Sequence, residues 1–246
     1  MKTASDFRRS ARESLRGKWR PAIAAGVLAS LLGGADGFIS GLRLNVDLSQ
    51  ARAKLTFAGL KLFSLGNTAD TTAPLPDLLL SSPLFWLLAL LLSVLLVILA
   101  SVVAVGYARF QLELSRGYTP SPRTVFAFFH RWKTITASSI LRSLYGIAWT
   151  LLLVFPGILA ALSYSMTDFI LAERTDLSAN QAISLSKAMM YGHRWRFLCL
   201  NLSFIGWNLL TVLTGGIAAL WVAPYLYAAQ CAFYREVSEI YYAAGH

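Results

Sequence analysis

Two charged residues in the apolar C-terminal half of the sequence are the first candidates for chemistry. Arg142 lies fourteen residues before Pro156, and Asp168 lies twelve after it. If the chain turns back there, a rise of about 1.5 Å per residue puts the two side chains about 21 Å and 18 Å from the turn, at nearly the same depth. Charges inside a membrane often mark a proton or ion path, whereas paired charges near the surface can simply orient two helices. We favour the second interpretation, because both side chains lie close enough to the membrane surface to reach it.

Other polar residues could also carry chemistry, and each has a structural alternative. Asp36 lies among glycines, where unwound backbone could coordinate a cation, but we favour an acidic residue that ends a membrane span. We expect Asn208 to form a hydrogen bond between helices. His130 and His193 have no Cys, Asp or second His at ligand spacing, so we expect no metal site and no cofactor.

Enzyme signatures are missing from the sequence. It has no Gly-rich phosphate loop, no zinc-protease helix and no Gly-x-Ser-x-Gly elbow. We therefore expect no catalytic residues and a protein that is not an enzyme.

One short basic-aromatic motif occurs three times and indicates how the chain is positioned. The copies are residues 17–20, 130–133 and 193–196, and a strongly apolar segment follows each. Trp and basic side chains favour the cytoplasmic face of a bilayer, where the indole lies among headgroups and the cation meets anionic lipid. We predict that eight side chains of the motif bind anionic lipid of the cytoplasmic leaflet. They are Trp19, Arg20, Arg131, Trp132, Lys133, Arg194, Trp195 and Arg196.

Composition indicates hydrocarbon rather than nucleic acid as the environment of this chain. The sequence is 56% hydrophobic and has a net charge of +10. The cations cluster beside apolar stretches and no nucleic-acid-binding motif accompanies them, so we expect no nucleic-acid partner. The sequence leaves protein partners open.

The three motif copies divide the chain into three repeats, each an interfacial amphipathic helix followed by a helical hairpin. The repeats cover residues 3–110, 120–175 and 177–240. They predict an all-α polytopic membrane protein with six transmembrane helices in a single membrane domain, 1–246. The first span should pack against another helix through a stripe of glycines four residues apart. These are Gly33, Gly37 and Gly41.

Two of the amphipathic segments have a well-defined apolar side. Residues 3–18 place Phe7, Ala11 and Leu15 on one helical face, with arginines around the rest. Such a helix is expected to lie in the interface with its apolar side in the acyl chains. Residues 178–192 begin with the capping-box pair Ser178 and Gln181, and we expect this helix to lie on the cytoplasmic membrane surface.

The segment between the first two spans has a different periodicity. Residues 42–49 alternate between apolar and polar, and residues 55–62 do so with a slip at Gly59. A period of two predicts strands, and the slip predicts a bulge. We expect a small extracytoplasmic β-hairpin within an insertion that covers residues 42–82.

The C-terminal apolar sequence must fold back on itself. Residues 197–234 carry no charge and would make one helix about 57 Å long, so a turn is expected at Thr214–Gly216. A shift of fifty-eight residues aligns Gly157 with Gly215, which predicts a second turn at Gly157. Basic residues cluster at the motifs and are missing from both turns, so we predict a multi-pass protein with N- and C-termini in the cytoplasm.

Most of the sequence resembles the DUF975 family of uncharacterised bacterial integral membrane proteins. The similar stretches are residues 11–19, 164–166, 169–173, 182–186, Met190 with Gly192, 202–207, 224–225 and 233–234. The resemblance implies a multi-pass protein of the bacterial cell membrane, and it supplies no catalytic residues.

Two functions are compatible with these features. The first is a non-enzymatic protein that organises the membrane or binds the lipid surface. The alternative is a transporter, or a transporter accessory subunit, for a small or amphiphilic solute. The spans contain few polar residues with which to line a wet path, which favours the first function. A solvent-connected cavity between the later spans would favour the second.

Overall fold

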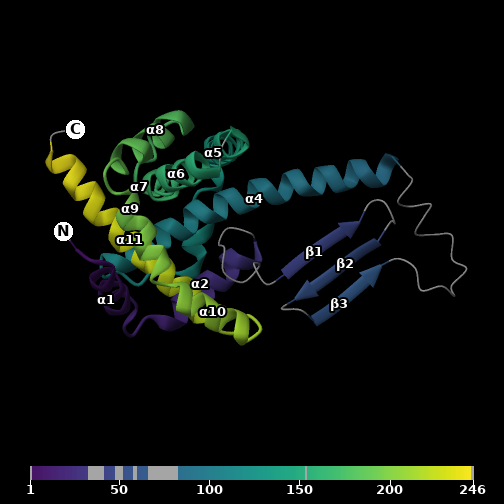
Figure 1. The fold of residues 1–246 in the computed structure, drawn as a ribbon, viewed down its shortest axis with the longest axis horizontal. Coiled ribbons are helices and arrows are strands. Elements are labelled where there is room, and N and C mark those ends of the chain that lie inside the picture. The colour runs from purple at the N-terminus through teal and green to yellow at the C-terminus, as the bar shows by residue number, and fades with distance from the viewer. Residues whose placement is uncertain are drawn as a thin grey trace, which may run out of the picture.

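The computed structural model describes residues 2–32, 42–47, 52–57, 60–65, 83–152 and 154–244. This part of the chain is helical apart from one small sheet, and one long helix extends away from the other helices (Figure 1). The helices are α1 (Ala4–Leu15), α2 (Trp19–Leu31), α4 (Pro83–Ser115), α5 (Trp132–Leu152), α6 (Val154–Tyr164), α7 (Thr167–Glu173), α8 (Ala179–Met189), α9 (Arg194–Leu202), α10 (Ile205–Leu213) and α11 (Ala219–Ala243). Two short 3-10 helices, η2 (Pro122–Phe126) and η3 (Phe129–Arg131), precede α5.

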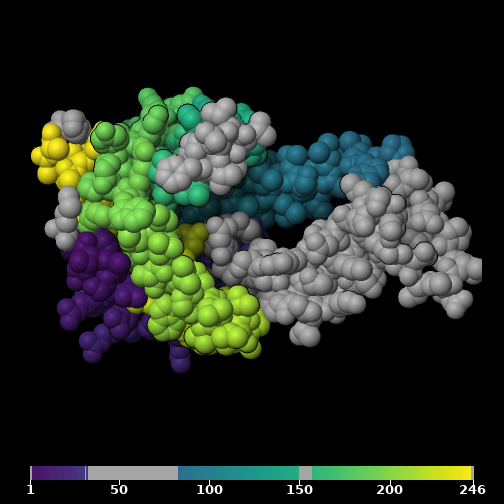
Figure 2. Space-filling view, viewed as in Figure 1, coloured from purple at the N-terminus to yellow at the C-terminus, as the bar shows by residue number. Residues whose placement is uncertain are grey.

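Helix α4 has two halves with opposite environments. From Pro83 to Ala100 its side chains are exposed or half-exposed on every side, and Figure 2 shows this part extending beyond the other helices. From Ser101 to Leu114 most side chains are buried in the protein. The exposed half has eighteen residues, about 27 Å of helix, which is close to the thickness of a bilayer core of about 30 Å.

Two helices of the described part are long and apolar enough to cross a membrane. They are α4 and the continuous pair α9–α10, which runs over Arg194–Leu213 with a short break at Ser203 and Phe204. Only 22% and 17% of their most apolar stretches are buried, whereas the core helix of a soluble protein is mostly buried. Helix α6 has eleven residues, about 16 Å, and is too short to cross alone. Six spans are therefore not evident from the helices that the structure describes.

The apolar face of α1 is covered by protein. Phe7, Ala11 and Leu15 are fully buried, and α1 packs along α11. The Phe7 ring meets Phe233 edge-on, with ring centroids 5.3 Å apart. The expectation that this face lies in acyl chains is therefore wrong, because α11 supplies the apolar partner instead.

Helix α8 is covered in the same way. Its predicted capping box is confirmed, with Ser178 and Gln181 satisfying each other's backbone N–H groups. Its apolar side chains, Ala182, Ile183 and Met189, are buried, and α8 packs on α5, α6 and α7. The side that was expected to hold this helix on the membrane surface is used within the protein.

The two predicted hairpin turns have different outcomes. Gly215 and Gly216 have φ values of 62° and 93° between α10 and α11, which confirms a turn at Thr214–Gly216. The turn predicted at Gly157 is wrong, because Gly157 lies inside α6. Pro156 lies in the first turn of α6, where a helix needs no N–H donor, so Pro156-Gly157 belongs to a helix start rather than a turn.

Three strands occur where the alternating pattern predicted a hairpin. They are β1 (Leu42–Asp47), β2 (Arg52–Phe57) and β3 (Leu60–Leu65), paired antiparallel in the order β1-β2-β3. The register shifts between Leu55 and Thr56. The predicted bulge residue Gly59 and the other residues of the insertion, 48–51, 58 and 66–82, lie outside the described residues.

Close packing joins α4 to η2 on the buried side of the bundle. A Cβ atom on Gly106 would lie 1.9 Å from the backbone carbonyl oxygen of Val125. Only glycine permits this approach of η2 to α4, because any side chain would overlap the carbonyl.

Candidate functional site

The structure brings Arg142 and Asp168 together from α5 and the first turn of α7. The Nη1 and Nη2 groups of Arg142 donate to the two carboxylate oxygens of Asp168, at 3.0 and 2.7 Å. The two side chains are 20% and 26% exposed. The N-terminus of α7 also favours a carboxylate at this position. The two-pronged geometry suits a clamp between helices.

The groups around the Arg142–Asp168 pair decide whether the pair could take part in chemistry. In the described ranges, no three His, Cys, Asp or Glu residues come close enough to hold a metal ion. The Nε group of Arg142 is buried and has no hydrogen-bond partner there. The two hydrogen bonds that join α5 to α7 are the contact that the structural interpretation predicts.

The interhelical amide contact forms at a residue other than the expected one. Asn208 is exposed on α10, and its side chain has no hydrogen bond within the described part of the chain. Gln230 of α11 instead donates to the Oδ1 atom of Asn201 in α9, at 3.0 Å. Asp36 and the glycine stripe lie outside the described residues, the latter being Gly33, Gly37 and Gly41.

The first motif copy lies at the start of α2. Trp19 is half-buried against the core, whereas Arg20 is exposed. Lys18 Nζ donates to the carbonyl oxygens of Gly117 and Tyr118, at 2.5 and 2.9 Å, and so ties this copy to the end of α4.

The second copy presents its tryptophan and lysine on the surface. Trp132 is 41% exposed, and Lys133 Nζ lies 5.8 Å from the centre of its ring. Arg131 instead donates to the carbonyl oxygen of Leu177, at 3.1 Å, and joins η3 to the start of α8.

Arg196 of the third copy points into the protein. Its guanidinium donates to Glu236 of α11 at 2.7 Å and lies 5.9 and 5.8 Å from the ring centres of Phe7 and Phe233. The expected lipid contact of Arg196 is therefore replaced by a clamp among α1, α9 and α11. Burial, and then the nearby Arg196 charge, lower the pKa of His193 below its ordinary value.

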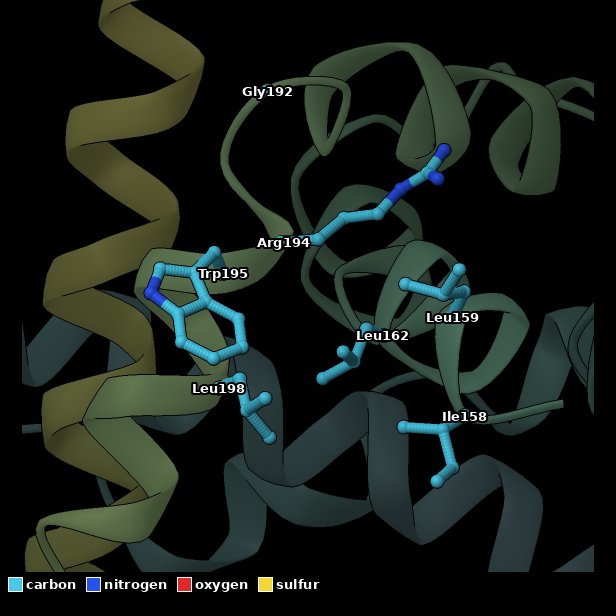
Figure 3. A pocket seen from close by; sticks show the side chains of 7 residues that line it. All are labelled: Ile158, Leu159, Leu162, Gly192, Arg194, Trp195 and Leu198. Carbon is cyan, nitrogen blue, oxygen red and sulfur yellow. The ribbon is translucent and has the colours of Figure 1, made fainter. Parts of the chain in front are cut away.

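The other two residues of the third copy border an apolar cleft. The cleft lies between α6 and α9 and has a volume of about 290 Å³ (Figure 3). Ile158, Leu159 and Leu162 of α6 form one wall, and Trp195 and Leu198 of α9 form the other. Gly192 closes the end at the turn before α9, where its φ is 79°.

Arg194 places a cation at the rim of this cleft. Its side chain extends over the hollow near Leu159, with the guanidinium at the end towards α8 (Figure 3). The Nε group is buried and has no hydrogen-bond partner among the residues that the structure describes, and no carboxylate there pairs with the guanidinium. Trp195 is 71% exposed beside it. The cleft thus combines apolar walls with one cation that has no protein counter-charge in this part of the chain.

The sequence did not predict this cleft, although it identified Arg194 and Trp195. The two walls are about thirty-five residues apart in the chain, and no local sequence pattern indicates that they face each other. The available signal was the spacing of Ile158, Leu159 and Leu162, which share one face of a helix.

Comparison with known proteins identifies a family. The family model described as "Protein of unknown function (DUF975)" matches residues 75–240. The match includes α4 to α10, most of α11, the Arg142–Asp168 pair and both walls of the cleft, and leaves α1, α2 and the sheet outside. No curated protein and no solved structure matches the chain.

Proposed function

The chain belongs to the DUF975 family, and we propose that it is a multi-pass membrane protein that binds and organises lipid without catalysing a reaction. The single observation that carries the proposal is the exposed half of α4. From Leu84 to Val97 it carries large apolar side chains on all sides, with Leu84 63% and Leu95 60% exposed. A helix that is apolar all round and that the described part of the chain leaves uncovered favours hydrocarbon as its surroundings.

Exposed apolar side chains also occur on α5, which packs against α4, and on α10. Ile140, Leu144 and Ile147 of α5 are more than half exposed, and so are Val212 and Leu213 of α10. Ser93, in the exposed half of α4, donates to the carbonyl of Leu90 at 2.8 Å, so its hydroxyl needs no water. These features support a lipid-facing belt over several helices.

We propose six spans in three repeats, with both termini in the cytoplasm of a bacterial cell. Support comes from the two ends of the chain, which lie together and away from the exposed half of α4 (Figure 1). The backbone N–H of Lys2 donates to Glu236 of α11, at 3.2 Å. Two termini on one side require an even number of spans.

The lining of the α6–α9 cleft favours lipid binding over transport of a hydrated solute. Its walls are aliphatic and aromatic, and its charge is confined to the rim. A conduit for a hydrated solute needs polar groups along its length. An amphiphile, in contrast, fits apolar walls and a single charge.

Cysteine labelling in intact cells tests the proposed placement. In a background without Cys199 and Cys231, Thr214→Cys in the α10–α11 turn should react with an impermeant maleimide added outside. The matched variant Lys187→Cys, exposed on α8, should react only after the membrane is opened. Labelling of Lys187→Cys in intact cells, or release of the protein from membranes by alkaline carbonate, would contradict the proposal.

A further inference from the structure

We propose that the cleft between α6 and α9 binds one anionic phospholipid, with an acyl chain between its walls and the phosphate on Arg194. The inference rests on the proposed function and names the lipid class that this site selects. It follows from three properties of the cleft: its apolar walls, its size and the charge at its rim.

The walls suit a hydrocarbon chain. Ile158 and Leu162 face Trp195 and Leu198 across the hollow (Figure 3), and Ile158 is 50% exposed. Filling the cleft with an acyl chain removes this apolar surface from contact with water or disordered lipid, and it restores the dispersion contacts that a void lacks.

The size of the cleft limits the occupant to one chain. A volume of about 290 Å³ lies just below the range for small-molecule sites, about 300–1,000 Å³. It is too small for both chains of a phospholipid, so the second chain stays in the bilayer. A lipid bound in this way remains part of the leaflet.

The rim selects an anionic headgroup. The Arg194 side chain extends over the same hollow, and its buried Nε group lacks a partner in the described part of the chain. A lipid phosphate at the rim would supply the counter-charge that the guanidinium lacks among the described residues. The cleft also reaches the first turn of α9, where free backbone N–H groups favour an anion.

The other cations of the motifs show why Arg194 differs. Arg196 is neutralised by Glu236 at 2.7 Å, and Arg131 donates to a backbone carbonyl. Arg194 has neither kind of partner among the described residues, and it alone of these three borders the cleft. Charge complementarity therefore favours a headgroup with a net negative charge, because the choline cation of a zwitterionic lipid offsets the charge of its own phosphate.

Native mass spectrometry of the full chain in mild detergent tests the inference. The probes are dioleoyl phosphatidylglycerol and dioleoyl phosphatidylcholine, which share their acyl chains and differ in headgroup charge. Wild-type protein should retain one phosphatidylglycerol, and Arg194→Gln should weaken its retention about tenfold, as loss of a charge-assisted hydrogen bond predicts. Leu162→Trp should fill the cleft and weaken retention of both lipids.

Two controls separate the site from general effects. Arg123→Gln removes an exposed cation of η2, outside the cleft and outside the three motif copies, and should leave retention unchanged. Arg194→Lys keeps the charge and should keep most of the preference for phosphatidylglycerol. Both Arg194 variants should unfold at the wild-type temperature when no lipid is added, which shows that the loss concerns binding.

Several results would overturn the inference. They are equal retention by Arg194→Gln and the wild type, equal retention of the two lipids, full displacement by inorganic phosphate, or a dimer in which a second copy covers the cleft. The proposed function is judged separately, by carbonate extraction and cysteine labelling of the same variants. Arg194→Gln should still be membrane-integral, so each proposal can fail without the other.

Discussion

The ion pair between Arg142 and Asp168 makes a quantitative prediction about stability. Both carboxylate oxygens accept from the guanidinium, and neither side chain is more than 26% exposed. Asp168→Asn leaves the guanidinium without its counter-charge, whereas the double replacement with Arg142→Gln leaves no unpaired charge. The single Asp168 change should therefore destabilise the protein more than the double change does.

The magnitude lies between the values for buried and exposed pairs. Removing one partner of a fully buried pair costs about 3–5 kcal/mol, and exposed pairs are worth about 0.2–1 kcal/mol. With about a quarter of each side chain exposed, we expect Asp168→Asn to lower the free energy of unfolding by about 2–3 kcal/mol. The coupling between the two sites should be about 2 kcal/mol, roughly a 30-fold effect on the folded-to-unfolded ratio.

A double-mutant cycle on unfolding in mild detergent measures this coupling. The matched control is the exposed pair Arg174 and Asp176, whose charged atoms are 3.7 Å apart and whose side chains are 43% and 69% exposed. Its coupling should stay below about 0.5 kcal/mol. If the Arg142 and Asp168 changes simply add, the pair is not a clamp. Wild-type stability of the double variant, combined with lost cellular function, would mark the pair as a functional site.

Three further changes test packing, capping and protonation. Gly106→Ala should lower the free energy of unfolding by more than about 2 kcal/mol, because its Cβ would overlap a backbone carbonyl of η2. Gly206→Ala is the control, since a Cβ there meets nothing within 4 Å. Equal denaturation midpoints of the two variants would contradict the close approach. Ser178→Ala should cost about 1 kcal/mol in the same assay by removing the N-cap of α8, and Ser178→Asp should cost less. Because folding lowers the pKa of His193, the wild-type protein should lose stability relative to His193→Gln as the pH falls below about 6.5. Above that pH the difference in the free energy of unfolding between the two proteins should stay constant. A constant difference over the whole pH range would show that folding does not perturb His193.

The position of the α5–α6 turn shows how far the internal repeat predicts the fold. The best match of apolar residues, a shift of fifty-eight, put the turn at Gly157. The motif tryptophans Trp132 and Trp195 are sixty-three residues apart, and sixty-three residues before Gly215 is Leu152, where α5 ends. The shift between the motifs thus predicts the helix end correctly. Apolar residues align at many shifts, because most apolar side chains are interchangeable in a membrane span or a protein core. A tryptophan beside basic residues is expected at one depth only, the membrane interface.

The amphipathic helices show a second limit of the sequence. The pattern Phe7, Ala11 and Leu15 predicted the buried face of α1 correctly, and the capping box predicted the start of α8. The pattern specifies which side avoids water but not what covers it. The partner of α1 is α11, more than two hundred residues away, and no local signal distinguishes that helix from an acyl chain.

The candidate site depends on the same kind of distant information. Arg194 and Arg196 are two residues apart in one motif, and their types and spacing predict the same role for both. Glu236 lies in α11, outside any repeat of the motif, and its carboxylate turns Arg196 into an internal clamp. Arg194 faces the cleft instead and has no such carboxylate within the described residues. A repeated motif therefore provides cations at similar depths, and the residues that pack opposite each copy decide whether its charge stabilises the bundle or remains available to a lipid.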